Sequence, residues 1–301
     1  MRRGTDGPPV RAHAKLNVRL RVLAREDGGY HSIETIFLRL DLADELRVDT
    51  LEEPGINLEV EGDPGVPSGP RNLCWRAAEL LLREIDDAPG VRIRLRKRIP
   101  AAAGLGGGSS DAAVVLRELA ARLGGPESPA RLMEFAGRLG SDVPFGLCAS
   151  AMALGWERGR RLLPLVPPEP RPVLILDPGR PISAADAYGW LAEDRAAGVA
   201  APPLPALLPE PMALARWDVL ASLAGNDLEE PVFRRHPDLR ALRDALREAG
   251  SGITLLCGSG SCVAGVFDDE RSREAAARAA VRLGTRVVRT WTVGPAPTGI
   301  A

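Results

Sequence analysis

A glycine-rich segment between a predicted strand and a predicted helix limits the folds open to this chain more than any other feature. Residues 91–96 alternate apolar and charged side chains, which is the period of a half-buried strand. After the segment, apolar residues recur at helical spacing between positions 112 and 123. The sequence therefore predicts a strand, a tight loop and a helix. The loop residues are Pro100, Ala101, Ala102, Ala103, Gly104, Leu105, Gly106, Gly107, Gly108, Ser109 and Ser110.

A loop of this kind is typical of a phosphate-binding site. Glycines let backbone N–H groups approach an anion closely, and the start of a helix carries partial positive charge. We expect Ser109 and Ser110 to open the helix; the alternative is a flexible connector that also caps it. No lysine follows the glycines, as a Walker A loop requires, and Ser109 stands where a dinucleotide fingerprint has its third glycine.

Composition and charge exclude several classes of protein. Of the 301 residues, 45% are hydrophobic and 26% are charged, and a net charge of −1 gives no general attraction for nucleic acid or an anionic membrane. No apolar run reaches the length of a membrane span, and the N-terminus lacks the apolar core of a signal peptide. The four cysteines lack metal-ligand spacing, so we expect a reduced, cytoplasmic protein.

Two residue types are rare enough to point to sites. Lys15 and Lys97 are the only lysines among 39 basic residues. A lysine retained against such an arginine bias indicates a compact charge that arginine does not replace, with chance retention as the alternative. For Lys97 two interpretations stay open, a contact to a nucleotide phosphate and a place on a solvated strand face. Tyr30 and Tyr188 are the only tyrosines.

The predicted elements favour an α+β fold over a doubly wound sheet. Five prolines between residues 164 and 172 mark the expected crossing from an N-terminal lobe, residues 1–163, to a C-terminal lobe, residues 164–301. Strands are expected at 12–23, 32–40, 46–48, 91–96, 173–176, 253–257, 263–267 and 286–293, and helices at 72–82, 112–123, 129–139, 238–249 and 271–283.

Two further patterns lie near the N-terminus. Lys15 and Asn17 are two residues apart on a predicted strand, so both side chains face the same side. A solvated edge strand is the alternative interpretation. Tyr30 and His31 follow a glycine turn, and an aromatic ring beside an imidazole suits a planar heterocyclic ligand. Taken alone, His31 is more often a surface or core histidine.

Two patterns in the second half of the chain also hold candidates. Asp142 lies between the expected helix end at Gly140 and Pro144, where a carboxylate serves as a general base or metal ligand, or more commonly as a turn or N-cap residue. Residues 258–261, Gly-Ser-Gly-Ser, form a second glycine turn between two predicted strands. Taken alone, that turn indicates a plain hairpin.

In their joint order, these motifs resemble the GHMP kinase superfamily. The matching blocks span nearly the whole chain: residues 14–17, 27–31, 104–113, 140–144, 226–229 and 258–261. The resemblance implies an α+β fold with a ribosomal protein S5 domain 2-like N-terminal lobe, a ferredoxin-like C-terminal lobe and an active site in the cleft between them. Within the superfamily, the chain is most similar to the branch that uses ATP to phosphorylate the 2-hydroxyl of a CDP-linked methylerythritol for isoprenoid synthesis.

The resemblance also implies roles for single residues. Asp142 is expected to accept the hydroxyl proton, and Lys15 to keep it ionised and steady the transferred phosphoryl group. The loop at 100–110 is expected to bind ATP with Mg²⁺, whose ligands stay open between Ser109, Ser110 and others. The residues expected to contact the cytidine are Asn17, Tyr30, His31 and Tyr188, with the two tyrosines stacking on the base.

Two positions qualify this picture. Ala184 stands where the family often has threonine, which puts one substrate hydroxyl contact in doubt. Asp111 is expected in the first turn of the helix, where it favours the helix dipole but opposes the phosphates unless Mg²⁺ intervenes.

Two other functions stay open. A kinase of the same superfamily acting on homoserine or a mevalonate-type alcohol is disfavoured by Tyr30, His31 and Tyr188, since those substrates have no base to stack. A non-enzymatic nucleotide or sugar sensor is disfavoured by Lys15 and Asp142. Small molecules are the expected partners, with no nucleic acid, membrane or tightly bound prosthetic group.

Overall fold

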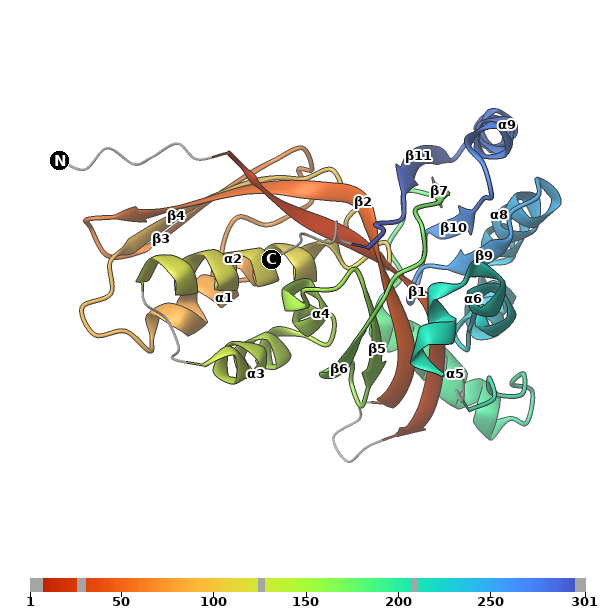
Figure 1. The fold of residues 1–301 in the computed structure, drawn as a ribbon, viewed down its shortest axis with the longest axis horizontal. Helices are drawn as coiled ribbons and strands as arrows, with labels where there is room; N and C mark the ends of the chain where they lie inside the picture. The colour runs from red at the N-terminus through yellow and green to blue at the C-terminus, as the bar shows by residue number, and fades with distance from the viewer. Residues whose placement is uncertain (1–7, 26–30, 124–127, 207–209, 296–301) are drawn as a thin grey trace. The chain divides into compact units, whose positions relative to one another are not determined.

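The computed structural model describes residues 8–25, 31–123, 128–206 and 210–295 (Figure 1). The strands in these ranges are β1 (Val10–Arg25), β2 (His31–Leu51), β3 (Ile56–Glu61), β4 (Gly90–Arg96), β5 (Met152–Trp156), β6 (Arg161–Leu165), β7 (Pro172–Asp177), β8 (Gly225–Asn226), β9 (Ile253–Leu256), β10 (Val263–Val266) and β11 (Arg286–Trp291). The helices are α1 (Leu73–Leu82), α2 (Gly107–Leu123), α3 (Pro129–Leu139), α4 (Val143–Leu147), α5 (Ala184–Ala196), α6 (Trp217–Leu223), α7 (Glu229–Arg235), α8 (Pro237–Glu248) and α9 (Glu270–Ala280), with 3-10 turns at η1 (Pro211–Ala215) and η2 (Val281–Leu283).

Two compact units make up the structure, and each is assembled from segments that are distant in sequence. The first comprises Met1–Ala14, Leu42–Ala101 and Gly106–Cys148, and the second comprises Lys15–Asp41, Ala102–Leu105 and Ala149–Ala301. Strands β1 and β2 and the glycine-rich loop therefore contribute residues to both units. A lobe boundary between residues 163 and 164 stays a prediction.

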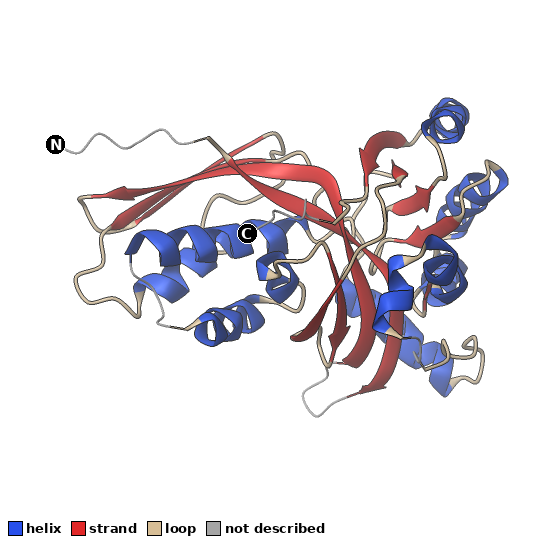
Figure 2. Cartoon of the chain, viewed as in Figure 1, coloured by secondary structure: helices blue, strands red, loops and turns tan. Residues whose placement is uncertain are grey.

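In the first unit, helices α1, α2 and α3 lie on one face of a sheet that contains β3 and β4 (Figure 2). Strand β4 pairs in parallel with β3 and antiparallel with the C-terminal half of β2, so Ile93 lies opposite both Leu58 and Val48. The alternation predicted for this segment is confirmed, because Val91, Ile93 and Leu95 are buried under the helices and the arginines between them face outward. The sheet thus fixes the strand that leads into the glycine loop.

The helices of the first unit begin at polar caps. Asn72 accepts a hydrogen bond from the backbone N–H of Cys74 at 2.8 Å and starts α1, and Ser128 caps α3, whose predicted limits are confirmed. The expectation that Ser109 opens α2 is wrong by two residues. The helix begins at Gly107, because the N–H of Ser110 already donates to the carbonyl of Gly106 at 2.9 Å. Two of the loop glycines are therefore helical.

The second unit contains a four-stranded sheet in the order β11-β7-β10-β9, antiparallel throughout. In chain order these are the fourth, first, third and second strands, which is the arrangement of a ferredoxin-like lobe, and that expectation is confirmed. Apolar side chains of α5, α7, α8 and α9 pack with the sheet in one core, which includes Leu174, Leu246, Phe267 and Ala277.

A second group of strands in this unit is built on β1 and the N-terminal half of β2. Strand β8 pairs in parallel with β1, β5 pairs antiparallel with the N-terminal half of β2, and β6 pairs with β5. The predicted break between 40 and 46 is wrong, since β2 runs unbroken through Asp44. A charged residue within an apolar run indicates a break in a strand. In the structure, however, the Asp44 carboxylate is buried and accepts the N–H of Ile99 at 2.9 Å.

The predicted α+β class is confirmed, although several elements were not predicted: β3, β5, β6, β8 and helices α4 to α7. Strand β6 was missed because Pro164 lies inside it. A proline is tolerated there because β6, within the described residues, pairs only with β5 and so leaves one edge open. Helix α5 was missed because its apolar residues form no continuous stripe.

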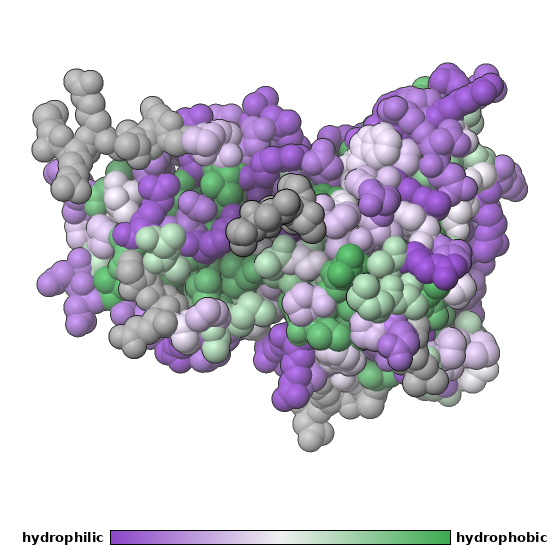
Figure 3. All heavy atoms as spheres, in the orientation of Figure 1, coloured by the Kyte–Doolittle hydropathy of each residue, from purple (hydrophilic) through white to green (hydrophobic). Residues whose placement is uncertain are grey.

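The surface of the described residues carries large apolar side chains singly, among them Met212, Val281 and Trp156. Figure 3 shows polar and apolar residues intermixed over one face. Single exposed apolar residues of this kind are normal for a globular protein. Among the described residues, no helix is both long and apolar enough to cross a membrane.

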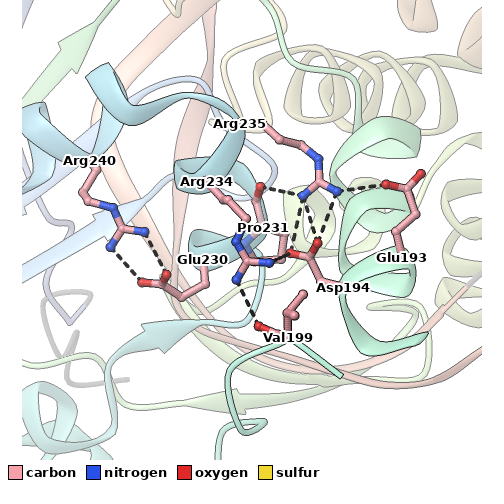
Figure 4. Close-up of polar contacts among 8 residues, drawn as sticks. All are labelled: Glu193, Asp194, Val199, Glu230, Pro231, Arg234, Arg235 and Arg240. Atoms are coloured by element: carbon pink, nitrogen blue, oxygen red, sulfur yellow. Dashed lines mark hydrogen bonds and ion pairs between the residues drawn. The ribbon is translucent and has the colours of Figure 1, made fainter. Parts of the chain in front are cut away.

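A buried carboxylate joins α5 to α7 in the second unit (Figure 4). Asp194 on α5 is 4% exposed, and it lies 3.1 Å from Nη1 of Arg234 and 3.2 Å from Nη1 of Arg235, both on α7. A second pair, Glu230 with Arg240, joins α7 to α8 but is more exposed. The Asp194 pairs fix the helix that carries Tyr188.

We predict that Asp194→Ala lowers the free energy of unfolding by about 2–3 kcal/mol, because it leaves two guanidinium groups without their buried carboxylate partner. The loss is no larger because those guanidinium groups are partly exposed and stay partly hydrated. Urea unfolding measures this change. The control is Arg240→Gln, which should cost about 1 kcal/mol or less because its ion pair is exposed. Equal losses in the two variants would contradict the prediction.

Glu229, the first residue of α7, is a second carboxyl group that is largely shielded from solvent, with 15% of its side chain exposed. Its Oε1 accepts the N–H of Leu256 at 2.9 Å, and its Oε2 lies 3.9 Å from Nη1 of Arg243. Burial raises the pKa of Glu229 to about 7, despite the opposing effects of this amide and of Arg243. The folded state therefore holds a proton here at pH values where the unfolded chain has lost it.

The stability that this proton provides should be complete below about pH 4.5 and should be lost as the pH rises through about 7. Glu229→Gln cannot titrate, so between pH 5 and 8 wild type should lose up to about 3 kcal/mol of unfolding free energy relative to the variant. Denaturant unfolding at several pH values measures both curves. Parallel curves for wild type and variant would refute the assignment.

Candidate functional site

The glycine-rich loop has a backbone that only small residues adopt easily. Gly104 and Gly106 have φ values of 78° and 71°, and Ala102 has a φ of 51°, all in the left-handed region. Ala103 and Leu105 point into the protein and are buried. Glycine is favoured at 104 and 106 because a side chain would strain a backbone with these positive φ values.

Helix α2 continues directly from this loop and presents an anion-binding end. The N–H groups of Gly107, Gly108 and Ser109 are in the first turn, where no intrahelical carbonyl is available to them. The 17-residue helix adds the positive end of its dipole. Gly108 is exposed and Ser109 is half-buried. A helix start of this kind is a common place for an anion in proteins, and phosphate binding by this one stays a prediction.

A buried ion cluster lies beside the first turn of α2. Nζ of Lys97 lies 2.7 Å from Oδ2 of Asp111 and also pairs with Asp44, and all three side chains are at most 4% exposed. A Cβ on Gly107 would lie only 3.3 Å from that Nζ. The cluster therefore joins the strand before the glycine loop to the helix after it.

The cluster corrects two expectations. Lys97 does not lie on a solvated strand face, because its ammonium is buried between carboxylates. A contact from Lys97 to a nucleotide phosphate stays a prediction. Asp111 is in the second turn of α2, not the first, since the helix starts at Gly107. Burial lowers the pKa of Lys97, but attraction to Asp111 and Asp44 outweighs it and raises that pKa; burial also raises the pKa of Asp111, against the opposing effect of Lys97.

Lys15 and Asn17 lie side by side on β1, as their spacing predicted. Nζ of Lys15 donates to Oδ1 of Asn17 at 2.6 Å, and Nδ2 of Asn17 donates to the hydroxyl of Thr35 at 2.8 Å. Both are buried, so the alternative of a solvated edge strand is wrong. Thr35 was not predicted, because one threonine in an apolar strand gives no signal in sequence.

Lys15 is also bonded to the glycine-rich loop. Its Nζ donates to the carbonyl oxygen of Gly104 at 2.9 Å, and its backbone N–H donates to that of Leu105 at 2.9 Å. The second glycine turn packs on the same place, since a Cβ on Gly104 would lie 1.7 Å from the carbonyl oxygen of Cys257. Three motifs that are far apart in sequence therefore meet at Gly104.

His31 and Tyr188 form a stacked pair in the second unit. Their ring centroids are 5.2 Å apart and their planes differ by 19°. Tyr188 lies on α5, whose N-cap Ser183 accepts the N–H of Asp186 at 3.0 Å, and Ala184 is the exposed first residue of that helix. Tyr30 lies outside the described residues. The structure thus brings together two of the residues expected to contact a base.

Asp142 occupies the N-cap position of α4 in the first unit and is half-buried. Its side chain makes no capping hydrogen bond to the helix. Asp142 therefore does not use its carboxylate to cap the helix, which is the common structural role of an aspartate at this position. Its pairing with Lys15, a residue of the second unit, stays a prediction.

No group of three or more histidine, cysteine, aspartate or glutamate side chains with metal-binding geometry occurs in the part of the chain that the structure describes. At the start of α2, Ser109 and Ser110 carry hydroxyl oxygens, and their role as cation ligands stays a prediction. Asp111 is not among them, because its carboxylate is buried against Lys97.

Comparison with known protein families agrees with this site. The model described as GHMP kinases N terminal domain matches residues 72–151, and the model described as GHMP kinases C terminal matches residues 211–285. Together they cover half of the chain. The first match contains the glycine loop, Lys97 and Asp142, and the second contains the second glycine turn.

Individual relatives are more specific. The chain is 42% identical to the 4-diphosphocytidyl-2-C-methyl-D-erythritol kinase of Moorella thermoacetica, over 89% of this chain and 93% of the relative, and 40% identical to that of Synechococcus sp., over 96% and 94%. A crystal structure of 4-(cytidine 5'-diphospho)-2C-methyl-D-erythritol kinase aligns with a TM-score of 0.76 at 35% identity, covering 95% of this chain and 99% of that one.

More distant structures share the fold alone. Homoserine kinase from Cytophaga hutchinsonii aligns with a TM-score of 0.61 at 15% identity, and mevalonate kinase from Methanococcus jannaschii with a TM-score of 0.63 at 13% identity. The glycine loop, the Lys15 network and these alignments lead to one assignment. The chain belongs to the 4-diphosphocytidyl-2-C-methyl-D-erythritol kinase family of the GHMP kinases.

Proposed function

We propose that this chain transfers the γ-phosphoryl group of ATP to the 2-hydroxyl of 4-diphosphocytidyl-2-C-methyl-D-erythritol, a step of non-mevalonate isoprenoid synthesis. The observation that carries the proposal is the bond from Nζ of Lys15 to the carbonyl oxygen of Gly104, which joins a buried lysine to the phosphate-binding loop. Relatives of this name that are about 40% identical over nearly the whole chain specify the substrate.

The loop at 100–110 holds the ATP phosphates in this proposal. Backbone N–H groups come from the left-handed residues Gly104 and Gly106 and from the first turn of α2. The side chains of Ala103 and Leu105 are buried and hold the loop to the protein. Phosphoryl transfer depends mainly on positioning and on stabilising charge, so a rigid cradle of N–H donors contributes directly to the rate.

Asp142 and Lys15 act on the acceptor hydroxyl. We assign Asp142 as the general base, because its carboxylate is half-buried and is not used to cap α4. Lys15 is proposed as the partner of that carboxylate and as the cation that steadies the charge of the phosphoryl group. Its ammonium is oriented by Asn17 and Gly104, so it is held in place before substrate binds.

Mg²⁺ fits the oxygens at the start of α2, where we propose that Ser109 or Ser110 contributes a ligand. This ion takes few protein ligands and keeps waters and phosphate oxygens around it. When bound, it neutralises charge on the phosphates.

Recognition of the cytidine is assigned to Asn17, Tyr30, His31 and Tyr188. The stacked rings of His31 and Tyr188 place an aromatic surface and an imidazole together, which suits a planar base with polar edges. We further propose lobes at residues 1–163 and 164–301, small molecules as the only partners, and a cytoplasmic location. Cys74, Cys257 and Cys262 are buried thiols, in keeping with a reducing compartment.

We predict that Asp142→Asn lowers kcat by about 10²–10⁴-fold, because an amide cannot accept the hydroxyl proton. Steady-state ADP release with the cytidylyl substrate measures kcat, and titration with an ATP analogue should show an unchanged Kd. Ser141→Ala is the control and should retain activity. A loss of less than tenfold in Asp142→Asn would show that another group is the base.

Tyr188→Ala should weaken binding of the cytidylyl substrate by about tenfold, since an aromatic stacking pair contributes roughly 0.5–1.5 kcal/mol beyond its buried area. Binding of the ATP analogue should stay unchanged, and Tyr188→Phe should be mild because the ring face is what matters. Calorimetric titration of both ligands tests this. Equal losses for both ligands, or no loss for the substrate, would favour a homoserine-type or mevalonate-type alcohol instead.

A further inference from the structure

Asn226, the last residue of β8, makes three hydrogen bonds with a buried side chain. Its Nδ2 donates to the carbonyl oxygen of Leu256 at 3.0 Å and to that of Gly258 at 2.7 Å, and its Oδ1 accepts the N–H of Leu228 at 2.9 Å. The side chain is 6% exposed. Two donors and one acceptor in one planar group are what an amide provides and what neither a carboxylate nor an apolar side chain provides.

The carbonyls that Asn226 holds lie at the start of the second glycine turn. This turn is in backbone contact with the glycine-rich loop, because a Cβ on Gly104 would meet the carbonyl oxygen of Cys257 at 1.7 Å. From the other side, a Cβ on Gly258 would lie 3.1 Å from the carbonyl oxygen of Gly104. With contacts this close on both sides, a shift of the turn must shift Gly104.

Gly104 in turn positions the lysine. Its carbonyl oxygen accepts the hydrogen bond from Nζ of Lys15 at 2.9 Å, and the Cβ position of Gly258 is itself 3.3 Å from that Nζ. Nζ is therefore confined by Gly104, Gly258 and Asn17 together. All of these residues belong to the second unit.

We infer that Asn226 is a positioning residue for phosphoryl transfer, which fixes the ammonium of Lys15 by holding the second glycine turn against Gly104. The inference rests on the proposed function, because it assumes that Lys15 takes part in the reaction. Displacing a reacting group by about 1 Å costs roughly 10²-fold in rate. Asn226→Ala should therefore lower kcat by about 10–100-fold and leave KM for ATP within about threefold.

The neighbouring Asp227 provides a matched control. Its Oδ2 accepts the N–H of Val22 at 2.8 Å and its Oδ1 accepts the N–H of Leu204 at 3.0 Å, so it fastens β1 and a loop and makes no such bond to the glycine turn. Asp227→Asn should lower the melting temperature in the same way as Asn226→Ala. Its kcat should stay within about twofold of wild type.

A double-mutant cycle on kcat tests the inference, with Asn226→Ala, Lys15→Ala and the double variant of the full chain. If Asn226 acts through Lys15, the double variant should be no slower than Lys15→Ala alone. If Asn226→Ala merely reduces the active fraction, the two losses should multiply, and the inference is overturned. An equal kcat loss in Asp227→Asn would also overturn it.

The same cycle distinguishes a failure of the inference about Asn226 from a failure of the proposed role of Lys15. Suppose that Lys15→Ala loses kcat and that the loss in the double variant is the product of the two single losses. Asn226 is then not a positioning residue, and the proposed function still holds. Full activity of Lys15→Ala removes the proposed role of Lys15 itself, and the inference falls with it. Should Asn226→Ala fail to fold, Asn226→Ser retains one donor and enters the same cycle, with an expected kcat loss of about tenfold or less.

Discussion

The close approach of Gly104 to the second glycine turn is the constraint on which the rest of the site depends. No side chain fits at 104, because a Cβ would lie 1.7 Å from the carbonyl oxygen of Cys257. The left-handed backbone at that residue turns its carbonyl toward Nζ of Lys15 at 2.9 Å. A single glycine thereby sets both the path of the glycine-rich loop and the position of the Lys15 ammonium group, which would be costly to bury without hydrogen-bond partners.

The two lysines of this arginine-rich chain are both buried, but their ammonium groups have different partners. Lys15 is buried beside carbonyl and amide oxygens, whereas Lys97 is buried between the carboxylates of Asp44 and Asp111. Both sites enclose a compact ammonium at short distance, where the planar guanidinium of arginine would not fit. Lys97 joins the strand before the glycine loop to the helix after it, so it braces the loop from within the first unit.

Homoserine and mevalonate kinases share this fold at 13–15% identity. A fold shared at this level of identity does not by itself determine the acceptor. In the proposed function, individual side chains carried by this fold select the acceptor, among them the stacked rings of His31 and Tyr188. Helix α5, which carries Tyr188, is held to α7 through Asp194 and so gives that ring a rigid support.

Local pattern alone determined the α+β class, the strand before the glycine loop, the presence of α1 and the limits of α3, because period and helix-start signals act within a few residues. It also identified Lys15 and Asn17 as neighbours, since residues two apart on a strand share a face. Only the tertiary structure decided that Asp111 and Lys97 form a buried ion cluster and that Asn226 holds the second glycine turn. Those contacts join residues 14 and 32 positions apart, and their energies depend on burial and exact approach, which no local period encodes.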